Sequence, residues 1–354
     1  MPSNRRIAAI VACLFAAGAA SLPAQPVSAQ AGAGAVVGTG AVTTFVENMD
    51  RTLAFYHDAF GMEVPPLPES GERPYNPSNS QLFAMFDIAG AKERHQSARV
   101  PGGDVRLEVM EVQNVAHRTI PLRLQDPGAM TLVFVVENVS AALERAKRAS
   151  AAVVTPGGAA VKLGDGTRAV LIKDVDGRFI ELRELAAQPN PAAAGSGITG
   201  MRLSIAVQDL ANTVQVYRDV LGFTVEEEHA LGADAALRAL TGLSNASFRR
   251  AIVRGPGAPP LRFELVEYRG VERKALDMRI QDRGAARIQL RADGLEALVA
   301  KMKKAGLQVV SVGGAPVPIP PNFMGALVKD PNNFFLTPIA QCDGCAPRLV
   351  PESH

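Results

Sequence analysis

Cysteine is scarce in this chain of 354 residues, and its three cysteines exclude most redox and zinc chemistry. Cys13 lies near the N-terminus, and only Cys342 and Cys345 follow, in the stretch QCDGC. A haem attachment would need a histidine after Cys345, where Ala346 stands, and a zinc knuckle would need a second pair of ligands. We therefore expect Cys342 and Cys345 to form a small disulfide loop in an oxidising compartment.

The chain also lacks an excess of charge of either sign. The formal net charge is +2, and it falls to 0 without Arg5 and Arg6 (2 − 2). Nucleic acids and anionic membranes bind basic surfaces, so we expect neither as a partner. Beyond the N-terminus, no apolar run is long enough to cross a bilayer. The motifs GxxxxGK[ST], GxSxG and HExxH are absent as well.

The N-terminus is typical of an export signal. MPSNRR is basic, IAAIVACLFAAGAA is apolar, and PVSA is a small-residue cleavage site before Gln30. We treat residues 1–29 as a signal peptide and expect a periplasmic or secreted protein. A membrane-spanning helix would need about 20 apolar residues, and Pro23 and Pro26 interrupt this run. A twin-arginine signal, or a lipoprotein signal around Cys13, stays open as an alternative.

The rest of the chain contains an internal duplication. Val46 matches Val207 at an offset of 161 residues (207 − 46), and LRLQDPGAM matches MRIQDRGAA at an offset of 156 (278 − 122). IKDVDGRF and VKDPNNFF keep the second offset, from Asp174 to Asp330. A constant offset across unlike segments indicates duplication.

Each half divides again into two modules. The first module opens with an alternating strand (Val42, Thr44, Val46), then Asn48 in position to cap a helix, and a helix that ends at Gly61. The same order recurs in TLVFVVENVSAALERAKRAS, LSIAVQDLANTVQVYRDVLGF and RIQLRADGLEALVAKMKKAG. Later strands, such as VRLEVMEV and LRFELVEY, again alternate with period two.

These motifs resemble those of the vicinal oxygen chelate superfamily, which includes glyoxalase I, extradiol dioxygenases and the bleomycin- and fosfomycin-resistance proteins. The resemblance is carried by V-x-[DN] before a helix with Tyr and a terminal Gly, and by the later KDxDGxxIEL. It covers nearly all of residues 36–341. It implies an α+β fold of four βαβββ modules, paired into two cup-shaped domains with the helices outside.

The expected domain organisation follows from the resemblance and the repeat. We expect a first domain at 36–188, an Ala-, Pro- and Gly-rich linker at 189–199, a second domain at 200–341, and a C-terminal tail at 342–354. The four modules are expected at about 36–113, 128–186, 200–269 and 284–341.

The resemblance also implies where a metal would bind, since catalytic members hold a divalent ion with His on the first strand and Glu on the last strand of each module. The first-strand positions, five residues before the valine of V-x-D in the first module and at its matching motif positions in the others, are Ala41, Thr131, Arg202 and Arg287. The last-strand positions are Glu108, Glu181, Glu264 and Thr337. None of the first four is a histidine, so we expect no metal centre and no cofactor.

The C-terminal half places arginines where a metal would lie. Strand alternation puts Arg202, Arg287 and Arg291 on the face away from the helices, together with one carboxylate, Glu264. A guanidinium has no lone pair for a metal. These residues form either an internal ion cluster or a receptor for a ligand carboxylate or phosphate. Both interpretations leave one arginine in excess, which an anion should balance.

In the N-terminal half we expect Glu108 and Glu181 to approach one another in one cup, completed by Thr131 and Ala41. Two carboxylates with water could bind Mg²⁺ or Mn²⁺. They could also bind a cationic group of a ligand, with one carboxyl neutral because like charges raise one pKa. A third option is that both glutamates are inert and solvated. His117, in the loop between the two modules, is the histidine to test as a further ligand.

The other histidines, His57, His95, His229 and His354, are assigned to a helix surface, loops and the chain end. The proline-rich stretch from Pro65 to Gln81 is long for a connection, so it either covers the mouth of the first cup or forms a surface insertion.

Three function classes remain. The preferred one is an exported protein that binds a small molecule, with an anion as one option, in its cups without a metal. The second is a lyase, isomerase or dioxygenase that uses Glu108 and Glu181 with Mg, Mn, Fe, Ni or Zn. The third is a structural or partner-binding protein whose vestigial cups are plugged by side chains. A homodimer is an option in each class, because each half could close its own cup or pair strands with a second chain.

Overall fold

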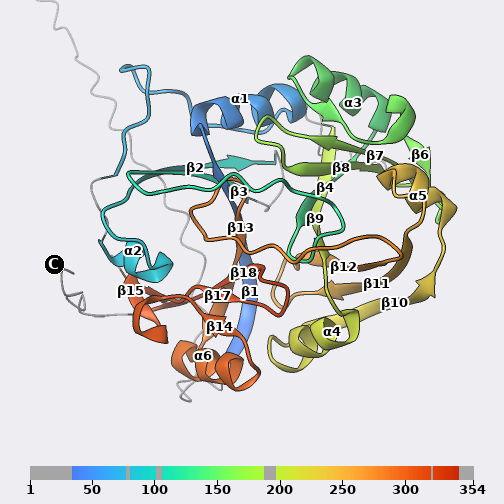
Figure 1. Ribbon diagram of the computed structural model, residues 1–354. Helices are drawn as coiled ribbons and strands as arrows, with labels where there is room; N and C mark the ends of the chain where they lie inside the picture. The colour runs from blue at the N-terminus through green and yellow to red at the C-terminus, as the bar shows by residue number, and fades with distance from the viewer. Residues whose placement is uncertain (1–33, 77–79, 101–105, 187–196, 320–321, 343–354) are drawn as a thin grey trace, which may run out of the picture. The chain divides into compact units, whose positions relative to one another are not determined.

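The computed structural model describes residues 34–76, 80–100, 106–186, 197–319 and 322–342 (Figure 1). The expected signal peptide, most of the linker and the tail after Cys342 lie outside these residues, and the statements about them stay predictions. Among the described residues, no helix combines the length and the apolar character needed to cross a bilayer.

Two mixed sheets form the framework of the described residues. The first has the strand order β14-β17-β18-β13-β1-β3-β2, with β15 and β16 attached to it. Its strands are β1 (Ala35–Val46), β2 (Lys92–Arg99), β3 (Arg106–Gln113), β13 (Ala286–Asp293), β14 (Gln308–Val309), β15 (Val317–Ile319), β16 (Phe323–Gly325), β17 (Val328–Lys329) and β18 (Phe335–Gln341).

The second sheet has the order β10-β11-β12-β9-β4-β8-β7-β5, with β6 paired to β7. Its strands are β4 (Met130–Val136), β5 (Ala152–Val153), β6 (Val161–Lys162), β7 (Arg168–Lys173), β8 (Phe179–Glu184), β9 (Ile198–Ala206), β10 (Thr224–Gly232), β11 (Ser247–Arg254) and β12 (Arg262–Arg269). The helices are α1 (Met49–Phe60), α2 (Ser80–Phe86), α3 (Val139–Arg148), α4 (Leu210–Asp219), α5 (Ala235–Thr241) and α6 (Leu295–Lys304), with short 3₁₀ turns η1 (Pro156–Gly158) and η3 (Val312–Gly314).

Strand alternation sorts the side chains into two layers, as the sequence predicts. Leu203, Ile205 and Val207 belong to the apolar cluster that also contains the buried faces of α1, α3, α4 and α6. Ile288 and Leu290 lie in the same cluster. The intervening residues face the other side of each sheet, which is the concave side of the cup.

The predicted caps begin the helices. The side chain of Asn48 accepts a hydrogen bond from Arg51 N at the start of α1, and that of Asp209 accepts one from Asn212 N at the start of α4. Gly61 ends α1 in the left-handed region at φ 61°, which a residue without Cβ adopts at little cost. These local signals therefore fix the strand-to-helix turns that begin the modules.

The motif KDxDG has a structural role. Tyr56 Oη of α1 donates to Asp174 Oδ2 at 2.9 Å, and Tyr217 Oη of α4 donates to Asp330 Oδ2 at 3.2 Å. All four side chains are buried. The most recognisable residues of the family pattern thus tie the first helix of each half to the second module of that half.

The modules share sheets across the two halves of the sequence. β1 pairs antiparallel with β13, so the first and fourth modules form one sheet. β4 pairs antiparallel with β9, so the second and third modules form the other. The strands of each half therefore pair with the other half of the same chain, and the described residues belong to one compact unit. We name the concave faces of the two sheets the β1–β13 cup and the β4–β9 cup.

Candidate functional site

The β1–β13 cup holds one carboxylate against one arginine. Thr43 Oγ1 donates to Glu108 Oε2 at 2.6 Å, and Arg287 Nη2 donates to the same oxygen at 3.1 Å. Arg287 is 3 % exposed, and this burial lowers its pKa against the attraction of Glu108. The expectation that Glu108 and Glu181 approach one another is wrong, because the two residues lie on different sheets.

Two polar atoms of this cup are buried without a hydrogen-bond partner among the described residues: Arg287 Nε and Thr337 Oγ1. Thr337 of β18 lies in register with Gln289 of the parallel strand β13, two residues after Arg287. The ring of Phe86, at the end of α2, lies 5.3 Å from the Arg287 guanidinium. Unpaired buried polar groups are costly, so they mark the place where a water or a ligand atom would be stabilised.

His95 belongs to β2, although the sequence assigned it to a loop. Its Nδ1 lies 2.8 Å from Glu93 Oε2, and Asn76 Nδ2 donates to the other Glu93 oxygen at 2.6 Å. The hydrogen bond to Glu93 raises the pKa of His95 against the effect of burial, and Glu108 adds to the rise. The i, i+2 spacing of Glu93 and His95 on a strand is the sequence signal that could have found this pair.

The β4–β9 cup holds two carboxylates bridged by arginines. Arg183 Nε donates to Glu181 Oε1 at 2.5 Å, and its Nη2 donates to Glu264 Oε2 at 3.4 Å. Arg250 Nη1 donates to Glu264 Oε1 at 3.2 Å. Burial raises the pKa of Glu181, with Arg183 opposing it, whereas Arg183 and Arg250 lower the pKa of Glu264 despite its burial.

A third arginine on this concave face forms no ion pair with a described residue, although Glu264 and Glu226 lie near enough to attract it. Arg202 is two residues before Ser204, which lines the cup, and its side chain makes no hydrogen bond or ion pair with any residue that the structure describes. Burial lowers its pKa, and repulsion from Arg183 adds to the effect. Three guanidiniums, of Arg183, Arg202 and Arg250, therefore face two carboxylates.

Both cups are closed by short helices in equivalent positions. Ser311 Oγ donates to the carbonyl of Met85 in α2, and Thr155 Oγ1 donates to the carbonyl of Leu240 in α5, both at 3.0 Å. The β4–β9 cup retains a cavity of about 30 Å³. Its walls are formed mainly by Thr131, Glu181, Arg183, Leu237, Leu240, Arg250 and Glu264.

The structure distributes the predicted ligand-binding residues over both cups. Thr131, Arg202 and Glu264 lie in the β4–β9 sheet, and Arg287 and Arg291 lie on β13 of the other sheet. Thr131 lines the cavity, whereas Arg291 is exposed. The sequence predicted that residues of one half of the chain share a cup, whereas each cup contains residues of both halves. The sequence of a strand does not specify which module the strand will pair with.

The remaining predicted residues lie elsewhere. Ala41 N donates a hydrogen bond to Gln289 Oε1, on the neighbouring strand β13, at 3.4 Å. His117 Nδ1 lies 2.8 Å from the carbonyl oxygen of Gln281 in a coil segment, bonded to backbone. Cys342 is disulfide-bonded, and Cys345 lies outside the described residues, so their pairing stays a prediction.

The donor sets do not fit a divalent ion of the kind the family fold implies. Glu108, Glu181 and Glu264 are each bound by an arginine, and a guanidinium can neither ligate a metal nor tolerate one nearby. Among the described residues, no group of three or more His, Cys, Asp or Glu side chains is arranged to hold a metal. We therefore derive no chemistry through a metal.

Comparison with known proteins agrees with this architecture. The model of the Glyoxalase/Bleomycin resistance protein/Dioxygenase superfamily matches residues 38–182 and 201–336. Glyoxalase I from Zea mays is 14 % identical, with a TM-score of 0.54 over 86 % of this chain and 92 % of that protein. A protein from Bacillus subtilis described as a candidate dioxygenase is also 14 % identical, with a TM-score of 0.53. The match covers 88 % of this chain and 87 % of the Bacillus subtilis chain.

These two structures are similar in fold alone at that level of identity, and no curated protein matches the sequence. The family match spans most of the chain, and the paired βαβββ modules agree with it. The chain therefore belongs to the Glyoxalase/Bleomycin resistance protein/Dioxygenase superfamily, also called the vicinal oxygen chelate superfamily.

Proposed function

We propose that this protein binds a small anionic molecule in the β4–β9 cup without a metal. The observation that carries the proposal is the excess of positive charge on the concave face, where Arg183, Arg202 and Arg250 lie near Glu181 and Glu264. Glu226, which also attracts Arg202, is already paired with Arg254 and Arg262. Arg202 has no partner among the described residues, and its planar fork suits a carboxylate or phosphate. An anion beside it would complete the charge balance.

Binding would require α5 to move. A cavity of about 30 Å³ holds about two water molecules, whereas pockets for drug-sized ligands occupy roughly 300–1,000 Å³. Leu237 and Leu240 of α5 are buried and line this cavity together with the charged side chains. We propose that a ligand displaces these two side chains and gains access to the arginines.

Calorimetric titration with mono- and dicarboxylates and phosphate esters tests the proposal. Arg202→Ala should weaken binding at least about tenfold, because a charge-assisted hydrogen bond is lost. Arg218→Ala is the matched control, since Arg218 is exposed on α4 and pairs with its neighbour Asp219. If Arg202→Ala binds the same anion as tightly as the control, the arginine proposal fails. If no anion binds, the cup is vestigial.

A second candidate function rests on the Glu93–His95 pair. A buried carboxylate that orients a half-exposed histidine is the arrangement of a general base. We propose that His95 removes the alpha proton of an alpha-hydroxycarbonyl compound and returns it to the former carbonyl carbon, while the hydroxyl proton moves to the former carbonyl oxygen. This isomerisation needs no metal. Loss of the alpha-proton signal of small carbonyl compounds in D₂O should be seen with the intact protein and not with His95→Ala. Equal exchange in both would exclude this role.

We also propose that the protein is exported. The proposal rests on the basic, apolar and small-residue segments of residues 1–29. Cell fractionation should find the mature chain, shortened to start at Gln30, outside the cytoplasm. A full-length cytoplasmic chain would contradict this.

A further inference from the structure

The third module has an open groove where the first module is covered by its own chain. In both modules a glutamate of the last strand binds the start of the helix: Met49 N donates to Glu111 Oε2, and Leu210 N donates to Glu267 Oε2, each at 2.9 Å. Each glutamate lies opposite an arginine in the strand register, Arg94 beside Glu111 and Arg249 beside Glu267. The two places are therefore equivalent in strand register and in this glutamate and arginine.

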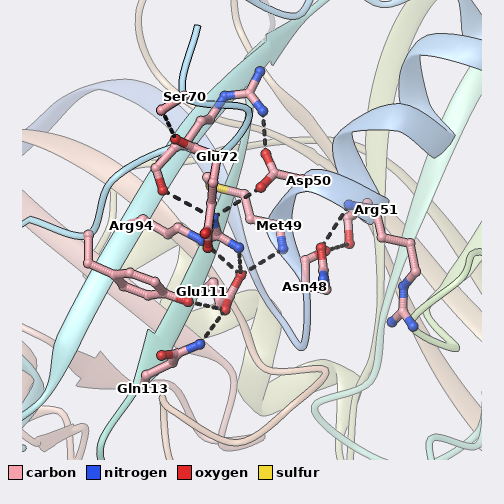
Figure 2. A network of polar contacts seen from close by, with 12 residues as sticks. Asn48, Met49, Asp50, Arg51, Ser70, Glu72, Arg94, Glu111 and Gln113 are labelled. Carbon is pink, nitrogen blue, oxygen red and sulfur yellow. Dashed lines mark hydrogen bonds and ion pairs between the residues drawn. The ribbon is translucent and has the colours of Figure 1, made fainter. Parts of the chain in front are cut away.

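In the first module a loop covers this place. The chain pairs with the edge of β2 at Glu63 and again at Asn76, and the residues between them fold over Arg94 and Glu111. The Tyr75 ring lies 4.9 Å from the Arg94 guanidinium, and its hydroxyl donates to Glu111 Oε1. Figure 2 shows Arg94 surrounded by Asp50, Glu72 and Glu111.

In the third module the covering loop is missing. The equivalent pairings are Thr224 with Arg254 and Gly232 with Phe248. Thr224 and Gly232 are eight positions apart (232 − 224), and the corresponding residues of the first module are thirteen apart (76 − 63). The third module therefore has five residues fewer in this stretch. What remains is an open groove of about 750 Å³. It is lined by Glu228, His229, Ala230, Leu231, Arg249, Glu267 and Arg269.

The charges of this groove are incompletely paired. Arg94 pairs with Asp50 and Glu111, whereas Arg249 makes no ion pair with any described residue. Ala211 stands at the position of Asp50, 161 residues on (211 − 50). Arg269 binds Glu267, as Gln113 binds Glu111.

Two further ionisable groups face the groove from β10. Glu228 has no ion pair among the described residues, and His229 lies 3.3 Å from Glu227. The groove lining therefore contains one unpaired carboxylate, that of Glu228, in addition to the unpaired guanidinium of Arg249.

We infer that this groove binds a phenol-bearing amino acid of the tyrosine type. Its carboxylate would bind the unpaired guanidinium of Arg249, as the carboxylate of Asp50 binds Arg94 in the first module. Its ring would stack on Arg249 as the Tyr75 ring stacks on Arg94. Its hydroxyl would donate to Glu267 Oε1, since the equivalent oxygen of Glu111 accepts both Tyr75 Oη and Gln113 Nε2. Its ammonium group would pair with Glu228.

The site lies on the helix side of the second sheet, because Glu267 binds the N-terminal residue of α4. It is separate from the concave face proposed above. Failure of one site therefore leaves the other untouched, and the two can be tested independently with the full chain.

Ligand-observed NMR with tyrosine, phenylalanine and tyramine tests the inference. Tyrosine should bind saturably, and phenylalanine, without the hydroxyl, and tyramine, without the carboxylate, should each bind at least about fivefold more weakly. Absence of tyrosine binding, or equal binding of all three probes, would overturn the inference.

Variants of the groove supply the second arm. Arg249→Ala should weaken tyrosine binding at least about tenfold and remove the preference over tyramine. Leu231→Trp should block the groove, and folding should be preserved because Leu231 is 55 % exposed. Arg254→Ala, on the same strand and paired with Glu226, is the matched control. Retained tyrosine binding in Arg249→Ala or in Leu231→Trp would refute the site.

Discussion

The two cups share one backbone plan and differ in the sign of their charge. The β1–β13 cup has Arg287 and His95 with two carboxylates, Glu93 and Glu108. The β4–β9 cup also has two carboxylates, but three arginines face them. The two cups are therefore expected to prefer different ligands.

The difference arises at equivalent positions. Arg287 in one cup corresponds to Thr131 in the other (287 − 131 = 156), and Thr337 corresponds to Glu181 (337 − 181 = 156). The β1–β13 cup thus has an arginine where the β4–β9 cup has a threonine, and a threonine where the β4–β9 cup has a glutamate. The strand register is the same in both cups. The duplicated fold determines where a side chain points, and the residue type alone determines what the cup can bind.

The largest expected effect comes from removing the arginine that bridges the two acids. Arg183→Met leaves Glu181 and Glu264 buried with less compensation, and it should lower the free energy of unfolding by about 3–5 kcal/mol. Urea denaturation at pH 7 measures this loss. Adding Glu181→Gln should restore much of the stability, because one uncompensated charge is then removed. If the double variant is as unstable as the single one, packing rather than charge explains the effect.

The second prediction contrasts the two Tyr–Asp anchors. Burial raises the pKa of Asp330 to about 6, against hydrogen bonds from Asn332 that lower it, whereas Asp174 has Arg178 beside it. Because the folded pKa exceeds the unfolded value of 3.8, Asp330 favours the folded state fully below about pH 4. This contribution is lost as pH rises through about 6 and amounts to about 3 kcal/mol.

Asp330→Asn tests that anchor. Its oxygen can still accept from the backbone, so the variant should be more stable than the natural protein at pH 8 and gain nothing at pH 4. Urea denaturation at both pH values measures the change. Asp174→Asn is the matched control. It should gain less stability at pH 8, because this substitution removes the attraction between the carboxylate and the nearby Arg178. A pH-independent effect of Asp330→Asn would contradict the raised pKa.

The third prediction separates the two threonines of the β1–β13 cup. Thr337→Val removes a buried hydroxyl without a described partner, and the free energy of unfolding should rise by up to about 1 kcal/mol. Thr43→Val removes the hydrogen bond to Glu108 and should lower it by about 1–2 kcal/mol. Thermal unfolding of both variants measures the pair. A loss of stability in Thr337→Val would indicate that a bound water or ligand satisfies the hydroxyl.

The smallest effect is expected in metal content. The purified protein should hold no stoichiometric Mg, Mn, Fe, Ni or Zn, and a Glu108→Ala, Glu181→Ala variant should show the same content, since arginines already bind both carboxylates. Elemental analysis of both forms checks this. Stoichiometric metal that is lost in the variant would restore the metal-dependent enzyme, and loss in His117→Ala would make that histidine a ligand.

Local signals in the sequence predicted the elements well. Asn48 and Asp209 cap the helices that they were expected to cap, and the alternation of Leu203, Ile205 and Val207 gives the correct buried face. These features depend on neighbours in the chain, so a single sequence contains them. The family pattern followed because it is made of such local signals.

Long-range features were not predictable in the same way. α2 and α5 close the cups, yet each has only seven residues and no strong periodic pattern. The stretch from Pro65 to Asn76 packs over Arg94 and Glu111, and α2, which follows, contributes Phe86 to the cup. The unpaired state of Arg202 and the partner of Glu108 depend on strands far apart in the chain.

The sequence by itself determined the four modules, their faces and the lack of imidazole at the first-strand positions, because strand period, caps and residue type are local properties. Tertiary structure alone decided that β1 pairs with β13 and β4 with β9, and hence which acids meet which arginines. The physical reason is that the backbone edges of duplicated modules are chemically alike. Only the packing of the whole chain distinguishes one partner from another.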